Sequence, residues 1–239
     1  MADELTIEQQ AIRDKAIKFA KQHRKNFSKN FTDKLIYPSE SNPVSVFMAG
    51  SPGAGKTEAS KALIAQFDDS IIRIDPDEFR TEFEDYTGDN SWLFQPAVSL
   101  IVERIHDLVL KQKQSFILDG TLTNHTKAEH NIARSLRKGR TVQILYVYQE
   151  PERAWEFVKA RELVEGRNIP KARFIAQYFE ARDSVNRLKR HFDGDIKVDL
   201  LLQNHDNTHQ LYKANIEDID NHLSEKYTAA ELEKLLCER

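Results

Sequence analysis

Short runs of apolar residues alternate along this sequence with longer segments in which apolar residues recur at helical spacing. The apolar runs are continuous rather than alternating, which is typical of strands buried on both faces of a parallel sheet. They span Val44–Ala49, Ile71–Asp75, Phe116–Asp119, Val142–Tyr148 and Ile196–Leu202. The helical patterns span Thr57–Phe67, Pro96–Lys111, Lys127–Arg137, Pro151–Glu165 and Pro170–Phe192. This alternation predicts an α/β fold, a doubly wound parallel sheet of about five strands with flanking helices.

Both ends of the chain carry helical signals outside this alternation. A capping box at Thr6 opens a helical pattern that predicts an N-terminal helical extension over residues 1–38, ended by a proline-rich break. Thr228, with a glutamate three residues later, is a second helix cap, and C-terminal helices are expected over about residues 208–239. We therefore expect the extension and a single domain over residues 39–239.

The composition favours a globular protein without a membrane span. Of the 239 residues, 40% are hydrophobic and 31% are charged. The longest unbroken apolar run is Ile144–Tyr148, whereas a membrane helix needs about 20 apolar residues. The acidic N-terminus lacks the apolar segment of a secretory signal, and the single cysteine, Cys237, has no partner for an internal disulfide. A cytoplasmic location is therefore expected.

Charge is distributed unevenly. The formal net charge of -3 argues against a dedicated nucleic-acid-binding protein. Residues 11–34 nevertheless hold eight Lys or Arg against Asp14 and Asp33, a local balance of +6. The solvated face of a helix explains such a stretch, and a docking surface for an acidic partner is the alternative.

The strongest chemical signal is a complete G-x-x-x-x-G-K-T motif that follows the first predicted strand and opens a helix. Its residues are Gly50, Ser51, Pro52, Gly53, Ala54, Gly55, Lys56 and Thr57. Glycines let backbone N–H groups curl around phosphate oxygens, and the helix N-terminus adds partial positive charge. Lys56 is expected to reach the β- and γ-phosphates of ATP, and the Thr57 hydroxyl to bind Mg²⁺. The motif predicts a fold of the P-loop NTPase type with ATP and Mg²⁺ as cofactors.

Carboxylates follow two other predicted strands. Asp119 ends the third strand and is expected to hold Mg²⁺ through a water; capping the next turn is the alternative. Asp75 and Asp77 end the second strand, at the same edge as the phosphate loop. One of these two is placed to accept a proton from an attacking alcohol, and the alternative is a turn with a helix cap.

A basic segment at about residues 159–173 lies between the fourth and fifth strands. In nucleotide kinases this region is the lid, whose arginines close on the transferring phosphate. Without the phosphate loop, the segment would be interpreted as an exposed helix hairpin. The guanine-specific Asn-Lys-x-Asp motif is absent, which disfavours a GTPase switch. His106, next to the apolar face of a predicted helix, is interpreted as a surface residue.

Taken together, these motifs resemble those of the zeta toxin family of P-loop kinases over about residues 40–205. The resemblance rests on the phosphate loop, on Asp75–Arg80 for the family's D-x-D-x-F-[RK], and on Asp119–Thr121 for its [DE]-G-T. It implies a kinase that transfers the γ-phosphate of ATP to a hydroxyl of UDP-N-acetylglucosamine or a related sugar nucleotide. It also implies an antitoxin protein as a partner that blocks the nucleotide site.

The same resemblance implies roles for individual residues. Asp77 resembles the catalytic base, Glu103 resembles the substrate-binding glutamate, and Arg161 and Arg167 resemble the lid arginines. From the same motifs, Arg80 and Thr121 are expected to contact the substrate.

Two other functions remain open. One is a polynucleotide 5′-hydroxyl kinase or another small-molecule kinase, with the basic extension holding phosphates. The acidic remainder of the chain and the lack of interleaved aromatic and basic residues disfavour nucleic acid. The other is a nucleotide-gated protein-binding module of a toxin–antitoxin pair.

Overall fold

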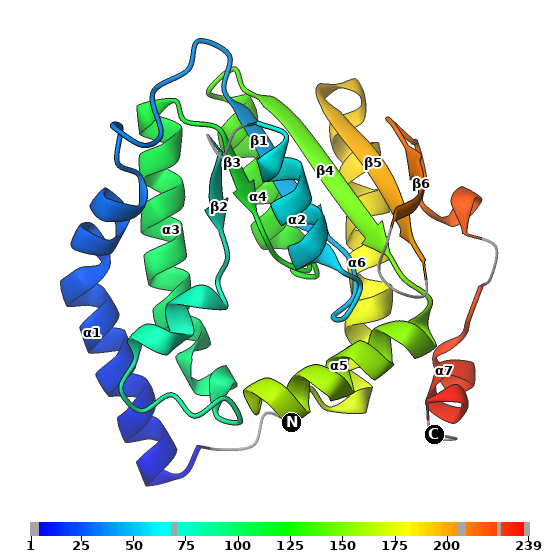
Figure 1. Cartoon of the computed structure of the whole chain (residues 1–239), viewed down its shortest axis with the longest axis horizontal. Coiled ribbons are helices and arrows are strands. Elements are labelled where there is room, and N and C mark those ends of the chain that lie inside the picture. The colour runs from blue at the N-terminus through cyan, green and yellow to red at the C-terminus, as the bar shows by residue number, and fades with distance from the viewer. Residues whose placement is uncertain (1–4, 68–70, 205–208, 224–225, 237–239) are drawn as a thin grey trace.

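The computed structural model describes residues 5–67, 71–204, 209–223 and 226–236. Cys237 lies outside these residues. A central sheet with helices on both faces forms the body of the molecule, and α1 and α3 stand side by side at one edge (Figure 1). Within the described residues, no helix combines the length and the apolar character needed to cross a membrane.

Among the described residues, six strands form one sheet in the order β2-β3-β1-β4-β5-β6. They are β1 (Val44–Ala49), β2 (Ile72–Ile74), β3 (Phe116–Leu118), β4 (Thr141–Tyr148), β5 (Ile196–Gln203) and β6 (His209–Lys213). The first five pair in parallel, and β6 pairs antiparallel with β5. The predicted α/β fold with a doubly wound parallel sheet is confirmed.

The helices connect these strands. They are α1 (Ile7–Phe31), α2 (Lys56–Ala65), α3 (Gln95–Gln112), α4 (His125–Leu136), α5 (Pro151–Glu165), α6 (Lys171–Phe192) and α7 (Ala229–Leu235). Short 3₁₀ turns lie at Glu78–Glu82, Ser91–Phe94, Asp193–Asp195 and Asp220–His222. The expectation of helices over about 208–239 is wrong at its start, because His209–Lys213 is the edge strand β6. The expected cap at Thr228 does begin α7.

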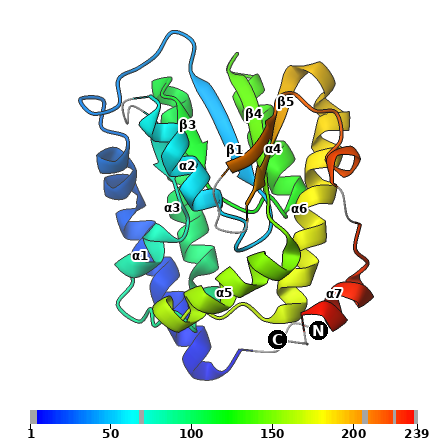
Figure 2. The ribbon, with the colours of Figure 1, turned by 45° about the vertical axis from the view of Figure 1, so that its right-hand side comes forward.

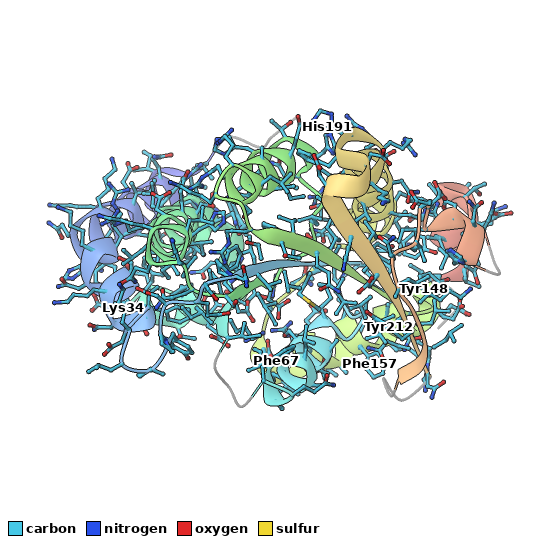
Figure 3. The ribbon with its side chains drawn as sticks, turned by 90° about the horizontal axis from the view of Figure 1, so that it is seen from above. Lys34, Phe67, Tyr148, Phe157, His191 and Tyr212 are labelled. Carbon is cyan, nitrogen blue, oxygen red and sulfur yellow. The ribbon has the colours of Figure 1, made fainter. Side chains whose placement is uncertain are left out.

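Alternate residues of the strands face opposite sides of the sheet. Phe47 and Ala49 of β1 belong to the larger core beneath α3, α4 and α6, whereas Val46 and Met48 belong to a smaller core beneath α2. Figure 3 shows the sheet edge-on between its helices, with His191 of α6 on one side and Phe67, after α2, on the other. A parallel sheet covered on both faces explains why its strands are continuous apolar runs.

The N-terminal helix α1 packs along α3. Ala16 and Ala20 are buried at this contact, since small side chains let two helices approach closely. The ring of Phe19 lies 5.5 Å from that of Phe83, measured between centroids. The helix ends at Phe31, before the residue 38 expected from the sequence.

His106 is not a surface residue, contrary to the sequence interpretation. It lies on α3 with 2% of its surface exposed. Its ring meets those of Phe47 and Phe116 at centroid distances of 6.4 and 5.0 Å. Burial, with the nearby Arg134 charge, lowers the pKa of His106 to about 3, so its imidazole is a neutral core group.

Candidate active site

The predicted chemical residues meet at one edge of the sheet, where the parallel strands end. The phosphate loop follows β1, the Asp75–Asp77 turn follows β2, and Asp119 follows β3. Figure 2 shows α5, which follows β4, lying across this edge. In open α/β sheets this is the edge where ligands bind, because the loops there converge.

The phosphate loop has a backbone that only glycine can adopt at two close contacts. Gly50 and Gly53 have φ angles of 136° and 73°. A Cβ atom on Gly50 would lie 2.3 Å from the Val147 carbonyl oxygen, and one on Gly53 would lie 2.0 Å from the Ala154 carbonyl oxygen. The loop is therefore pressed against β4 and α5 in a tight curve of the kind that lets backbone N–H groups line an anion cradle.

Lys56, the first residue of α2, folds back over this loop. Its Nζ donates to the carbonyl oxygens of Gly50 at 3.1 Å and Ser51 at 2.6 Å. Burial lowers the pKa of Lys56 to about 8, against the opposing charges of Asp119 and Asp77. The ammonium is thus held by neutral carbonyls, which an anionic phosphate would outcompete.

Asp77 lies at the centre of a group of arginines that come from both sides of the site. Its Oδ1 accepts a hydrogen bond from Arg80, and its Oδ2 accepts one from Arg167. The Nη2 atom of Arg161 lies 3.9 Å from the same Oδ2. Burial alone would raise the pKa of Asp77, but these three arginines outweigh it and hold the pKa below its usual value. The structure thus brings both predicted lid arginines to the predicted base.

Asp75 is engaged differently. Its Oδ1 accepts from the backbone N–H of Asp77 at 2.8 Å, and its Oδ2 accepts from Arg73 Nη2 at 2.5 Å. Burial raises the pKa of Asp75, with the charges of Asp77 and Asp119 acting in the same direction. Both oxygens of Asp75 therefore shape the turn, while Asp77 is the carboxylate that contacts the predicted lid arginines.

Asp119 is buried and joined to two residues that the sequence analysis did not single out. Its Oδ2 accepts from Ser60 Oγ at 2.9 Å and from Arg73 Nη2 at 2.7 Å. Thr57 stands at the start of α2, one turn before Ser60. A threonine hydroxyl and a carboxylate are oxygen donors of the kind that Mg²⁺ prefers.

Three further residues were predicted to bind substrate. Arg80 is buried and also donates to Gln95 Oε1 at 2.9 Å. Thr121 touches the phosphate loop, since its carbonyl oxygen accepts from the Gly50 N–H at 3.3 Å. Glu103 lies on the exposed side of α3. In the part of the chain that the structure describes, no hydrogen bond or ion pair joins Glu103 to these residues.

The family model of the zeta toxins matches residues 28–217. The chain belongs to the zeta toxin family. This match covers the phosphate loop, the Asp77 turn, Asp119 and the lid arginines, so the resemblance inferred from the motifs is confirmed.

Among curated relatives, toxin PezT of Streptococcus pneumoniae serotype 4 (strain ATCC BAA-334 / TIGR4) is 23% identical over 121 residues. Those residues make up 48% of this chain and 48% of PezT, so the match spans about half the length of this zeta toxin relative.

Solved structures share the fold at low sequence identity. One from the characterisation of the PezAT chromosomal toxin–antitoxin system of Streptococcus pneumoniae has a TM-score of 0.64 and 16% identity, and the match covers 99% of this chain and 90% of that one. A structure of AvrRxo1-ORF1:-ORF2 with ATP has a TM-score of 0.61 and 15% identity, over 91% of this chain and 72% of that one. The zeta toxin fold is thus shared across nearly the whole chain.

Proposed function

We propose that this zeta toxin family protein is a phosphotransferase that moves the γ-phosphate of ATP to a hydroxyl of a sugar nucleotide such as UDP-N-acetylglucosamine. The observation that carries the proposal is the contact of Asp77 with Arg161 and Arg167 beside the phosphate loop. In this proposal, Asp77 is the base, and the two arginines bind phosphate where acceptor and γ-phosphate would meet.

The phosphate loop supports ATP as the donor. Gly50 and Gly53 approach the backbone of β4 and α5 so closely that a Cβ atom would collide with it, and this close packing fits the tight turn of a phosphate-binding loop. Among the described residues, Lys56 Nζ donates to the carbonyl oxygens of Gly50 and Ser51, and in this proposal it turns toward a phosphate. In this arrangement the loop N–H groups and Lys56 bind and orient the β- and γ-phosphates.

Thr57 and Asp119 would hold Mg²⁺, since a hydroxyl and a buried carboxylate suit this cation. When bound with the nucleotide, the ion neutralises charge on the β- and γ-phosphates. The part of this chain is to fix the donors: Asp119 is held by Ser60 and Arg73, and Thr57 by the first turn of α2.

Asp77 accepts the proton of the acceptor hydroxyl in this proposal. Its arginine partners keep it ionised, but they also make it a weak base while the site is empty of phosphate. When Arg161 and Arg167 turn to phosphate oxygens, Asp77 loses two positive neighbours and its pKa rises. Nucleotide binding would therefore increase the basicity of Asp77 when an acceptor is present.

The charges of the site favour a sugar nucleotide over a polynucleotide end. Carboxylates accept hydrogen bonds from sugar hydroxyls, but they repel the phosphodiesters that flank a nucleic-acid 5′ end. Arg161 is 46% exposed on its side chain and could reach the diphosphate of a sugar nucleotide. After the site closes, the Glu103 carboxylate would accept a further hydrogen bond from a sugar hydroxyl.

A protein partner forms part of the proposal. The neighbours in structure include a toxin–antitoxin system and a two-protein AvrRxo1 complex. We propose that an antitoxin controls this chain as well, by covering the nucleotide site.

The acceptor is tested by offering UDP-N-acetylglucosamine and a 5′-hydroxyl oligonucleotide in parallel, with γ-labelled ATP and Mg²⁺. We expect label in the sugar nucleotide with the wild-type protein and none with Lys56→Met, which serves as the matched control. Label that enters only the oligonucleotide would contradict the sugar nucleotide as acceptor. Label in neither, with ATP bound, would point to another hydroxyl acceptor.

A further inference from the structure

Arg73 is a charged residue inside a buried strand. It stands in β2 between Ile72 and Ile74, both of which face the larger core. Because side chains alternate along a strand, Arg73 points to the opposite face, toward α2. Only 10% of its side chain is exposed, and a buried guanidinium is costly unless its N–H groups are all paired.

The guanidinium of Arg73 joins carboxylates from three segments. Its Nη2 donates to Asp75 at 2.5 Å and to Asp119 at 2.7 Å, and its Nη1 donates to Glu78. Its Nε lies 3.0 Å from Ser60 Oγ and 3.1 Å from Asp119 Oδ2. We call Asp75, Glu78 and Asp119 the acidic junction.

The acidic junction contains more negative charge than the single arginine neutralises. Oxygens of Asp75 and Asp119 both accept from one nitrogen atom of Arg73. They are therefore close enough for one cation to contact both. Without a cation between them, these buried carboxylates would repel each other, and one would take up a proton.

We propose that Arg73 is the permanent cation of this junction and prevents a divalent metal ion from binding there. The inference rests on the proposed function in one respect, the metal ion of the reaction. That ion then binds only together with ATP, on the side of Asp119 that faces Thr57. Arg73 acts as a positioning residue, because it fixes Asp119 and, through Asp75, the turn that carries Asp77.

An arginine is suited to this role for geometric reasons. Its planar fork has five N–H groups and can bond several oxygens at fixed angles, whereas a lysine presents one compact charge. The Arg73 fork contacts the ends of β2 and β3, the Glu78 turn and α2 together. A metal ion could replace its charge, but only by drawing the carboxylate oxygens inward.

The test measures Mn²⁺ binding to the whole 239-residue chain without nucleotide, by the loss of the free-ion electron spin resonance signal. The variants are Arg73→Met, which removes the charge, and Arg73→Lys, which keeps it. Arg134→Met is the matched control, because it removes a mostly buried arginine that pairs with the single carboxylate of Asp107. Thermal unfolding of each variant is followed with and without Mn²⁺.

We expect Arg73→Met to bind Mn²⁺ at least about tenfold more tightly than the wild type, and its lowered Tm to rise when Mn²⁺ is added. Arg73→Lys and Arg134→Met are expected to bind Mn²⁺ no more tightly than the wild type. Mn²⁺ is expected to leave the Tm of all three proteins unchanged. The proposal is overturned if Arg73→Met binds Mn²⁺ no more tightly than the wild type, or if Mn²⁺ does not raise its lowered Tm. Neither readout needs phosphate transfer, so this result and that of the acceptor assay can fail independently.

Discussion

Each phosphate-binding cation proposed for this site holds an oxygen atom of the protein itself. Lys56 donates to carbonyl oxygens of the phosphate loop. Arg161 Nε lies 2.6 Å from Glu165 Oε2, and Arg167 forms an ion pair with Asp77. These contacts keep positive charge paired until an anionic ligand arrives. Binding of ATP then exchanges internal partners for phosphate oxygens.

The pKa of Lys56 gives a pH dependence for ATP binding. In the free protein Lys56 loses its proton as pH rises through about 8, whereas phosphate binding favours its charged form. We therefore expect constant ATP affinity below this pH and a fall of about tenfold per pH unit above it. Calorimetric titration from about pH 6.5 to about pH 9.5 measures this, with Lys56→Met as a weak, pH-independent control. Wild-type affinity that stays constant throughout would contradict the expectation.

The sequence revealed the residues whose roles follow from spacing, and it missed those that depend on distant partners. The phosphate loop and the Asp77 turn were predicted because a short motif specifies each one. Arg73 was overlooked because its partner Asp119 lies 46 residues away. The apolar spacing places His106 beside the apolar face of its helix and therefore predicts a surface position, whereas α3 packs against both the sheet and α1.

At the scale of elements, the proposed lid segment consists of the end of α5 and the start of α6, with Arg167 between them. We expect Arg167→Ala to lower kcat by about 10²-fold or more and to change KM for ATP less, because lid arginines act on charge that develops in transfer. Removing this arginine also raises the pKa of Asp77 in the free protein. The acid limb of the kcat/KM–pH profile, which reports the free enzyme, should therefore move to higher pH.

Arg187→Ala is the control for this variant, since Arg187 lies on α6 away from the lid and pairs with Asp183 at 3.5 Å on the exposed side of that helix. Steady-state kinetics measure kcat and KM for ATP in both variants. A large rise in KM with kcat preserved would show that Arg167 binds ground-state phosphate only.

The packing of α1 on α3 predicts that this helix supports the fold. Ala20 is fully buried at the contact, so Ala20→Leu should overpack it and destabilise the protein by about 1–3 kcal/mol. Lys21→Ala, on the exposed side of the same helix, should change stability by no more than about 0.5 kcal/mol. Urea unfolding compares them; equal stabilities would mean that α1 does not contribute to the core.

The sequence predicts a helix or strand correctly where the segment has its own apolar periodicity. It fails where pairing with a neighbouring strand determines the structure. The buried strands and the amphipathic helices were located to within a few residues. The strand β6 was missed because His209–Lys213 has no apolar run, and it is extended only through pairing with β5.

At the scale of the whole molecule, the strand order explains why distant motifs meet. The strand β1 lies between β3 and β4, and β2 lies beyond β3. The loops after β1, β2 and β3 and the helix after β4 therefore converge at one edge of the sheet. The shared fold at 16% identity with the PezAT structure indicates that this arrangement tolerates wide sequence change, while the acceptor depends on side chains that the fold does not specify.

The central claim is that Asp77 accepts the proton while ATP lies on the phosphate loop. The most direct test compares Asp77→Asn and Asp75→Asn, two isosteric changes, for ATP affinity and for single-turnover loss of the γ-phosphate to the acceptor. We predict that Asp77→Asn binds ATP within a few-fold of the wild type and transfers phosphate about 10³-fold more slowly or worse, while Asp75→Asn retains more activity. Near-normal transfer by Asp77→Asn, with transfer abolished in Asp75→Asn, would contradict the account.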